Sequence, residues 1–333
     1  MEAGDTTDLF YVRMDANTVA LIRMGLLEPL SGSDTLTADA AQMLPQIEQA
    51  ITWGDTLYAL ADELYLPVWM IRKDAAAAPP ATVLELLAQD AAWYTTPQQR
   101  TMFLANDYNT KPWAKTDYAR YALQHYIIEA ESAGGSPDFS AECFTMFLES
   151  LKAARLSEAE FPEQSNVIAA NATYPLLGLG EADVQSQWQW MRSPMVGADG
   201  ADVISANLFA YVVNPHGANR DAAIAYLEYA AAHRDARLRA LLSPDTAQPS
   251  LFAYAQEDEG FQALPDAWEV SAQALALYRT DIAPQIDLML SPLLAIQSLN
   301  DTSAFSGMMA AIQAYVQGKT TLDECVAGLN SLK

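Results

Sequence analysis

The side chains that most often carry chemistry in proteins are scattered along this sequence. Its three histidines, His125, His216 and His233, are far apart and belong to no HExxH motif, and its two cysteines have no metal-ligand partner at a useful spacing. A glycine-rich phosphate loop and a Gly-x-Ser-x-Gly nucleophile elbow are also missing from the sequence. We therefore expect no cofactor, no metal ion and no catalytic residues of these classes.

Acidic side chains could still do chemistry, because the chain has 42 of them. A pair such as Asp199 and Asp202 could bind calcium through its carboxylate oxygens. Carboxylates among Asp55, Asp62 and Glu63 could serve as the acid and the base of a glycoside hydrolase. In so acidic a chain such pairs also arise by chance and are then simply solvated, so an enzyme of this type is an alternative and not the main hypothesis.

Aromatic residues give a more specific indication. The sequence has seven tryptophans and 15 tyrosines. Flat rings at strand ends and turns can stack on the C–H faces of sugars, because the two surfaces match in shape and polarity. Five tryptophans lie in or beside predicted turns and breaks: Trp53, Trp69, Trp113, Trp190 and Trp268. Each could instead pack within a core, so the sequence alone leaves both roles open.

Charge and hydropathy limit the classes of partner. The 18 Lys and Arg residues against 42 Asp and Glu residues give a formal charge of −24, which repels phosphate backbones, so we expect no nucleic-acid partner. The apolar fraction of 51% is ample for folded cores. No run reaches the roughly 20 apolar residues needed to cross a bilayer, and the N-terminus lacks the order of a secretory signal. We expect the chain to be soluble as it stands.

Hydrophobic periodicity predicts short strands alternating with helices. Residues 8–12 (DLFYV) have the pattern of a buried strand, and residues 18–24 (TVALIRM), which Gly25 closes, that of the following helix. Further helices are predicted at 38–50, 83–94, 116–132, 139–154 and 221–232, and further strands near 64–71, 173–179, 187–195 and 203–213. Pro67 inside the run 64–71 predicts an edge strand or a bend. The alternation indicates an α/β fold rich in helix.

The junction at residues 207–230 (NLFAYVVNPHGANRDAAIAYLEYA) joins a strand to an alanine-rich helix through Asn-Pro and a Gly-Ala-Asn turn. This junction resembles the extracellular solute-binding proteins of ABC transporters, the group that includes maltose-binding and oligosaccharide-binding proteins. In that family a strand recrosses between lobes and is followed by a helix with the pattern NP.S.N..AA..FL. The positions that match are Asn214-Pro215, Asn219, Ala222-Ala223 and Tyr226-Leu227.

Other segments are similar to the same family and keep its order. They are residues 8–11 followed by 21–30, then 56–67, 139–156 and 308–332. The chain starts almost at the family's "PDI" strand, so an N-terminal portion on the order of half a lobe is expected to be missing. The segment Ser303-Ala304-Phe305-Ser306 lacks the aromatic residue that maltose-binding proteins place after this phenylalanine, so the resemblance does not imply a maltodextrin ligand.

The resemblance implies a two-lobe, periplasmic-binding-protein-like (type II) fold with lobes joined by crossing strands. Residues 1–68 and 206–260 would form lobe 1, residues 69–205 lobe 2, and residues 261–333 C-terminal helices mainly of lobe 2. Such a protein captures a small solute between its lobes, closes by hinge motion and delivers the solute to a membrane permease. The solute would be an oligosaccharide or a peptide, with a carbohydrate as the first expectation. The full-length protein would be extracellular, as a cell-surface lipoprotein, or periplasmic.

The ligand contacts that this resemblance implies lie in the loop after the first strand and among the aromatic residues: Arg13, Asp15, Asn17, Trp69, Trp113, Tyr174 and Trp190. Asp15 is the best polar candidate, because a carboxylate accepts paired hydroxyl hydrogen bonds. Asp15 could equally be the N-cap of the helix that includes Thr18. Two alternatives to solute binding remain open: a glycoside hydrolase, and a ligandless sensor or adaptor with the same fold.

Overall fold

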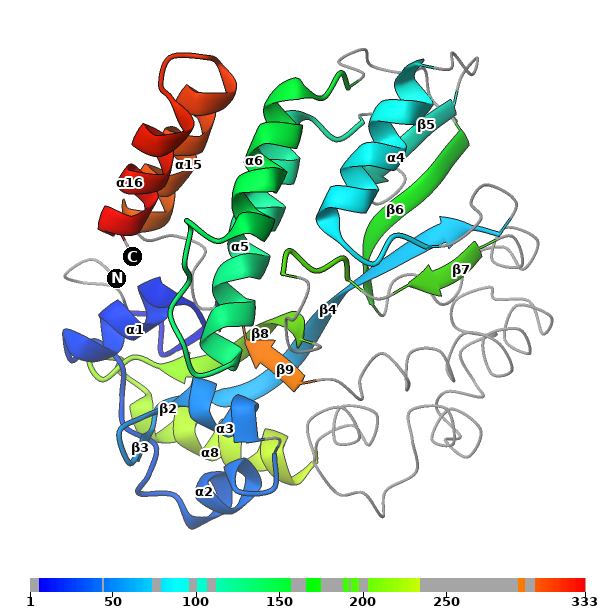
Figure 1. The fold of residues 1–333 in the computed structure, drawn as a ribbon. Helices are drawn as coiled ribbons and strands as arrows, with labels where there is room; N and C mark the ends of the chain where they lie inside the picture. The colour runs from blue at the N-terminus through cyan, green and yellow to red at the C-terminus, as the bar shows by residue number, and fades with distance from the viewer. Residues whose placement is uncertain are drawn as a thin grey trace. The chain divides into compact units, whose positions relative to one another are not determined.

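The computed structural model describes residues 6–43, 45–73, 79–95, 101–106, 112–156, 166–174, 188–191, 193–197, 203–233, 293–296 and 303–332. Contacts within the chain divide it into two compact units (Figure 1). Unit 1 holds the described residues of 1–65, 206–263 and 294–301, and unit 2 holds those of 66–205, 264–293 and 302–333.

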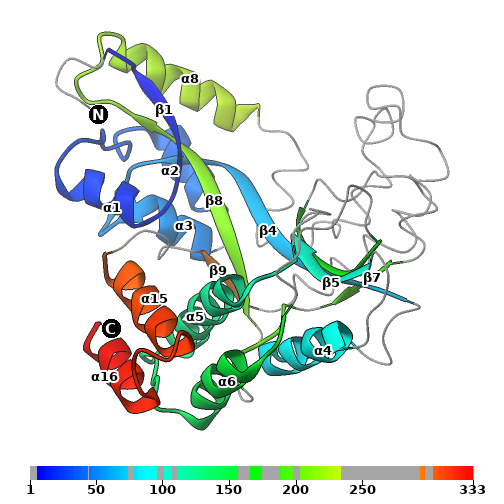
Figure 2. The same ribbon diagram turned by 90° about the horizontal axis from the view of Figure 1, so that it is seen from above.

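Unit 1 is built on a short antiparallel sheet with helices beside it. Strand β8 lies between β1 and β4 and runs antiparallel to both of them (Figure 2). Helix α8 buries Ala223, Leu227 and Ala231, which share one helical face, and contacts α2. The elements are β1 (Leu9–Arg13), α1 (Ala16–Arg23), α2 (Asp34–Ala40), α3 (Pro45–Ile51), β2 (Thr52–Trp53), β3 (Thr56–Leu57), the first part of β4 (Leu60–Arg72), most of β8 (Val203–Val213) and α8 (Arg220–Ala232).

The turn between β8 and α8 is tied to the residue that precedes β1. Asp8 Oδ1 accepts the backbone N–H of Asn219 at 2.7 Å, and its Oδ2 accepts Asn219 Nδ2 at 3.0 Å. The bond from the backbone N–H lowers the pKa of the Asp8 carboxyl. The backbone N–H of Asn214 donates to the Asp8 carbonyl at 2.9 Å. These bonds fix the start of α8 against the edge strand β1.

Unit 2 combines a second set of strands with a layer of helices. Strand β6 pairs antiparallel with β4 and parallel with β5, and β7 also pairs with β4. Helices α4, α5 and α6 contact one another, and α15 and α16 lie side by side against them (Figure 1). The elements are the rest of β4, α4 (Val83–Thr95), β5 (Thr101–Asn106), α5 (Lys115–Ser132), α6 (Glu142–Ala153), β6 (Asn166–Tyr174), β7 (Trp188–Met191), α15 (Ser303–Val316) and α16 (Leu322–Leu332).

Two strands run through both units. In the part of the chain that the structure describes, seven strands form one sheet in the order β1-β8-β4-β6-β5, with β7 paired to β4 and β9 (Leu293–Ile296) paired to β8. Strand β4 changes unit between Tyr65 and Leu66, and β8 changes unit between Ser205 and Ala206. The predicted helix-rich α/β fold, with two parts joined by crossing strands, is confirmed.

As a whole β4 is an interior strand, so the prediction of an edge strand is wrong for most of its length, but at Pro67 itself the described strands pair with β4 on one side only. Pro67 pairs with Thr173 of β6. Strand β8 pairs with β4 as far as Tyr65, and β7 pairs with it from Trp69 onward. The proline, which has no N–H to donate, therefore falls between the segments that β8 and β7 pair with, where a missing donor costs little.

The single helix predicted at residues 38–50 is also wrong. Helix α2 ends at Ala40 and α3 begins at Pro45. A proline disrupts a helix interior but is well suited to the first helical position, where its missing N–H has no intrahelical partner to lose. Pro45 therefore starts a new helix in place of continuing the first one.

Candidate functional site

The turn between β1 and α1 gathers the three polar residues that the sequence singled out. Asp15 caps α1, since its Oδ1 accepts the backbone N–H groups of Asn17 at 2.9 Å and Thr18 at 3.2 Å. Its Oδ2 accepts Nε and Nη2 of Arg13 at 3.2 and 3.0 Å. The capping role that the sequence left open for Asp15 is confirmed. We call Arg13, Asp15 and Asn17 the polar turn.

Burial and hydrogen bonds hold the polar turn in place. Asp15 is 7% exposed, whereas the Arg13 side chain is 31% exposed. Thr18 Oγ1 donates to the Arg13 carbonyl at 2.7 Å, which closes the turn from the other side. The carboxylate holds two of the five guanidinium N–H groups in a fixed geometry. The turn thus presents a preorganised cation at the carboxyl end of β1.

An aromatic surface adjoins the polar turn on the same face of the sheet. The Tyr11 ring stacks on Phe209 with centroids 5.6 Å apart and meets Tyr211 at 4.9 Å. Tyr11 pairs in register with Tyr211, and Arg13 pairs with Phe209. Tyr11 is 44% exposed, and Phe209 and Tyr211 are half-buried. We call Tyr11, Phe209 and Tyr211 the aromatic platform.

The amide of Asn207 extends this face along β8. Asn207 lies two residues before Phe209, so the two side chains leave the strand on the same face. Its Oδ1 is buried and, in the described part of the chain, has no hydrogen-bond partner. A buried acceptor without a donor is costly, and a ligand hydroxyl could satisfy it once the neighbouring side chains move to admit the ligand. Cation, amide and stacked rings on one face are groups that can bind a polar ligand with an apolar side, such as a sugar.

Unit 2 carries a separate group of rings that is largely buried, with Tyr121 half-buried at its margin. Trp69 of β4 meets Trp113 at 5.2 Å and Tyr121 of α5 at 5.1 Å, both edge to face. Tyr121 lies 4.4 Å from the His125 ring, and Trp113 lies 5.2 Å from Tyr118. Trp69 is fully buried and Trp113 is 5% exposed. We call these five residues the aromatic cluster; they form part of the core of unit 2.

Hydrogen bonds from α5 anchor the segment that follows β7. Tyr121 Oη donates to the Pro194 carbonyl at 3.0 Å. The Glu129 carboxylate accepts the backbone N–H groups of Val196 at 2.8 Å and Gly197 at 2.9 Å. These bonds position the segment 193–197 on the side of α5 that bears the aromatic cluster.

Burial shifts the pKa values of three groups on or beside α5. Desolvation raises the pKa of Asp90 to about 7, against the hydrogen bond that Tyr118 Oη donates to Asp90 Oδ2 at 2.7 Å. Desolvation lowers the pKa of His125 to about 4. It also raises the pKa of Glu129, against the opposing effect of the Val196 and Gly197 N–H groups. All three shifts come from packing inside unit 2.

The structure brings the predicted site residues together in two groups. Arg13, Asp15 and Asn17 form the polar turn of unit 1, and Trp69 and Trp113 touch in the aromatic cluster of unit 2. Tyr174 is the last residue of β6 and pairs with Leu66 of β4, and Trp190 of β7 pairs with Met70 of β4. The side chains of Tyr174 and Trp190, and the whole of Trp268, lie outside the described residues. Ligand contact by any of these residues stays a prediction.

The acidic residues of the hydrolase alternative lie on different elements. Asp55 is in the turn of the β2-β3 hairpin, and Asp62 is a half-buried residue of β4. The side chain of Glu63 is outside the described residues. Among the described residues no three His, Cys, Asp or Glu side chains are grouped to hold a metal ion. No helix in this part of the chain is both long and apolar enough to cross a membrane.

The sequence reasoning missed the aromatic platform and Asn207. The signal was present in the alternation of residues 207–212, where Leu208, Ala210 and Val212 are buried and the residues between them are not. Period-two alternation places Asn207, Phe209 and Tyr211 on one face. The contribution of Tyr11 could not be read locally, because it depends on the pairing of β1 with a strand almost 200 residues later in the chain.

The chain is similar to known proteins in structure and not in sequence. No protein-family model matches the chain, and no curated protein matches it in sequence. Maltose-bound MalE3 of T. maritima superposes with a TM-score of 0.62 and 12% identity, covering 99% of this chain and 85% of that one. An ABC substrate-binding protein of Listeria monocytogenes in complex with cycloalternan superposes with a TM-score of 0.60 and 11% identity, covering 99% of this chain and 84% of that one.

A third structure agrees with these two. The GacH receptor of Streptomyces glaucescens GLA.O, solved without ligand and with acarbose, gives a TM-score of 0.60 and 13% identity, covering 97% of this chain and 82% of that one. Identities this low establish similarity of fold and not of ligand. The chain has the periplasmic-binding-protein-like fold of the carbohydrate substrate-binding proteins of ABC transporters.

Proposed function

We propose that this protein captures a small solute, most readily a carbohydrate, and delivers it to the membrane permease of an ABC transporter. The observation that carries the proposal is the fold, which matches over 97–99% of the chain those of proteins solved with maltose, cycloalternan or acarbose. In this proposal the two units act as lobes, with boundaries near residues 68, 205 and 260. The full-length protein then works outside the cytoplasmic membrane, as a lipoprotein or in the periplasm.

The described side chains of unit 1 support a carbohydrate more than a peptide. A sugar ring offers hydroxyl groups at its edge and C–H groups on its faces. The polar turn supplies a held guanidinium from Arg13, Asn207 supplies an amide oxygen, and the aromatic platform supplies ring surface. In this proposal Asp15 acts mainly by orienting Arg13, because both of its oxygens already accept hydrogen bonds from the protein.

Unit 2 would contribute through the remaining predicted residues. Tyr174 and Trp190 lie on strands that pair with β4, in register with Leu66 and Met70 near the point where β4 changes unit. Trp69 and Trp113 are buried, so their part in the proposed function is to fix β4 against α5. Binding needs no covalent step, which agrees with the lack of a recognisable catalytic motif in the sequence.

The test is a thermal-shift screen with mono- and oligosaccharides and short peptides, followed by calorimetry and product analysis of every hit. A ligand that binds only the folded state raises the melting temperature. Saturable binding of a saccharide without product supports the proposal. Release of a sugar product would support the hydrolase instead, and no shift with any compound would favour the ligandless sensor or adaptor.

Substitution at the polar turn locates the binding site. Asp15→Asn keeps an N-cap side chain but removes the charge that holds Arg13. We expect it to weaken saccharide binding about tenfold, equivalent to about 1.4 kcal/mol, with little change in stability. Asp34→Asn is the matched control, because Asp34 is an exposed acid in the first turn of α2 in the same unit. Equal effects of the two substitutions would remove the polar turn from the site.

A further inference from the structure

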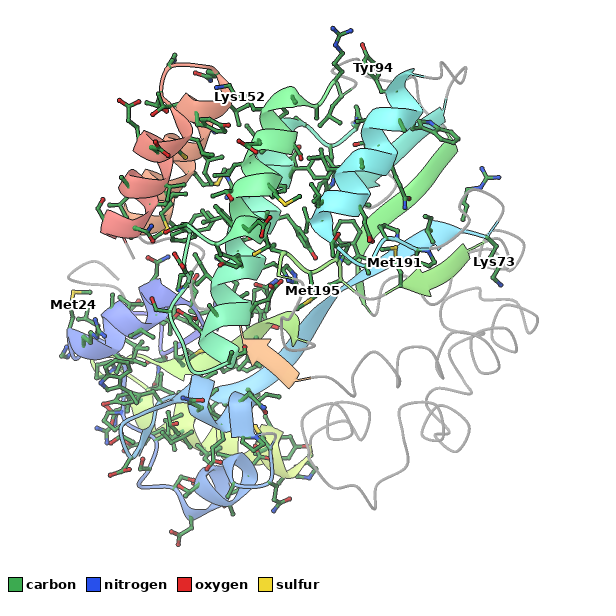
Figure 3. The ribbon with its side chains drawn as sticks, in the orientation of Figure 1. Met24, Lys73, Tyr94, Lys152, Met191 and Met195 are labelled. Carbon is green, nitrogen blue, oxygen red and sulfur yellow. The ribbon has the colours of Figure 1, made fainter. Side chains whose placement is uncertain are left out.

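A cavity of about 540 Å³ lies wholly within unit 2, at the seam between its C-terminal helix pair and the other helices. Four elements line it: the end of α4, the start of α5, the residues after α6 and the end of α15. Figure 3 shows Tyr94 and Lys152 at the same end of this helix layer. The cavity shares no residue with the polar turn, the aromatic platform or the aromatic cluster.

The lining combines an aromatic ring with planar polar groups. Tyr94 is 47% exposed, and Gln313 and Gln317 are exposed one helical turn apart at the end of α15. Thr116 adds a hydroxyl and Arg155 a guanidinium. The apolar floor consists of alanine and aliphatic side chains: Ala114, Ala119, Ala154, Leu156, Ile312 and Val316. Such a mixture suits a small ligand that has an apolar face and several hydroxyl groups.

The charges around the cavity favour a neutral ligand over an anion. Lys115 lines the cavity, but its Nζ donates to the Lys152 carbonyl at 2.7 Å and so neutralises the C-terminal end of α6. The Asp117 carboxylate accepts the backbone N–H of Ala114 at 2.8 Å and places a negative charge at the start of α5. Helices α4 and α15 also end here and add partial negative charge, while the N-terminal end of α5 adds a partial positive charge that the Asp117 carboxylate offsets. These charges offset the guanidinium of Arg155.

We propose that this cavity is a second binding site, separate from the solute site of the proposed function, for a neutral polyhydroxylated ligand of one or two sugar rings. The ligand stacks on Tyr94 and accepts and donates hydrogen bonds with Gln313, Gln317 and Thr116. It thereby bridges α15 to α4 and α5. Binding is weak, with dissociation constants in the millimolar range, because the cavity is open and buries only part of the ligand.

The test uses glucose, N-acetylglucosamine and myo-inositol as probes of the full chain. Hydrogen exchange followed by mass spectrometry reads the two sites separately, because peptides from residues 303–317 report on the cavity and peptides from residues 8–18 report on the polar turn. We expect saturable protection of the 303–317 peptides. Gln313→Ala together with Gln317→Ala should weaken this protection at least fivefold, and Ala154→Phe, which fills the cavity, should abolish it.

Controls separate this site from the proposed function. Tyr226→Ala removes from α8 in unit 1 a tyrosine that is exposed to a similar extent as Tyr94, and it should leave the protection of 303–317 unchanged. Asp15→Asn should likewise leave it unchanged, whether or not the polar turn binds solute. The proposal is wrong if none of the three probes protects these peptides. It is also wrong if sulfate or phosphate protects them in a way that Arg155→Gln removes, because the cavity would then be an anion site.

Discussion

The carboxylate of Glu129 on α5 accepts the backbone N–H of Val196, 67 residues later in the chain, at 2.8 Å. Its other oxygen accepts the next N–H, that of Gly197, at 2.9 Å. One side chain therefore fixes two consecutive amides of the segment that leads from β7 toward β8. A carboxylate is suited to this task, because its two oxygens accept independently and charge strengthens both bonds.

Removing this acceptor should destabilise unit 2. Glu129→Ala leaves two amide donors without their acceptor and should reduce the free energy of unfolding by about 2–4 kcal/mol, whereas Glu129→Gln keeps one acceptor oxygen and should cost about half as much. Urea denaturation measures both values. Glu131→Gln, at an exposed position of the same helix, is the control and should change little. If Glu129→Ala behaved like this control, the two hydrogen bonds would not stabilise the segment.

Acid should destabilise the protein through His125. Its pKa falls from 6.5 to about 4 on folding, so between these values the unfolded state binds a proton that the folded state does not. The stabilising contribution is complete above pH 6.5 and is lost as the pH falls toward 4, for a total of about 3 kcal/mol. Glu129 Oε1 lies 3.9 Å from His125 Nδ1, and its negative charge would moderate the loss.

Replacing the imidazole tests this contribution. His125→Phe keeps an aromatic ring beside Tyr121 but cannot titrate. Denaturation at pH 8 and pH 5 should show a smaller loss of stability on acidification for this variant than for the unchanged protein. His233→Gln removes an exposed histidine of unit 1 and should leave the loss unchanged. Identical pH dependence in His125→Phe and the unchanged protein would mean that folding does not lower the pKa of His125.

Asp90 should act in the opposite direction. Its pKa rises from 3.8 to about 7 on folding, so the folded state keeps a proton that the unfolded state releases. Stability that is present below pH 3.8 is therefore lost as the pH rises to 7, by about 4 kcal/mol in total. Asp90→Asn cannot ionise but still offers an oxygen to Tyr118 Oη. We expect it to be more stable than the unchanged protein at pH 8 and similar at pH 4.

The partner of Asp90 supplies the comparison. Tyr118→Phe removes the hydroxyl that favours the ionised carboxylate, so it should raise the pKa of Asp90 further and deepen the loss of stability above pH 7. Urea denaturation of both variants from pH 4 to pH 8 measures these effects. An Asp90→Asn protein that is less stable at pH 8 would show that the charged hydrogen bond outweighs desolvation.

The sequence predicted best those elements that local chemistry decides. The alternation in 203–213 and the Asn-Pro turn after it predicted β8 and the start of α8, because period two and turn residues act within a few positions. Strand β5 was not predicted, since its partner β6 begins about 65 residues later and supplies the pairing that makes Thr101–Asn106 a strand. Non-local pairing of this kind has no local sequence signature.

In the candidate site, too, the features set by neighbouring residues could be predicted and those set by distant residues could not. Asp15, beside Arg13 and Asn17, could be predicted because an N-cap and its neighbours lie within one turn. The burial of Trp69 could not, because it depends on α5 bringing Tyr121 against the ring from more than 50 residues away. The local sequence around a tryptophan at a strand crossing does not show whether its side chain faces solvent or a core.

The turn after β8 also predicts the effect of a single methyl group. A Cβ at Gly217 would lie 2.5 Å from Asp8 Oδ1, 3.0 Å from Asp8 Cα and 3.3 Å from the Asn214 carbonyl oxygen. The same Asp8 carboxylate accepts two hydrogen bonds from Asn219, so it cannot move aside without breaking them. Gly217→Ala should therefore cost about 1–3 kcal/mol by overpacking, measured as the change in free energy of unfolding in urea.

A second glycine separates this contact from the general effect of replacing glycine in a turn. A Cβ at Gly32 would meet no atom within 4 Å, so Gly32→Ala should be close to neutral. In a protein that already carries Asp8→Ala, Gly217→Ala should cost less free energy of unfolding than it does in the unchanged protein, because the methyl group then has more room. Equal costs for Gly217→Ala and Gly32→Ala would show that the turn adjusts. In that case its close approach to β1 would not be what requires a glycine at position 217.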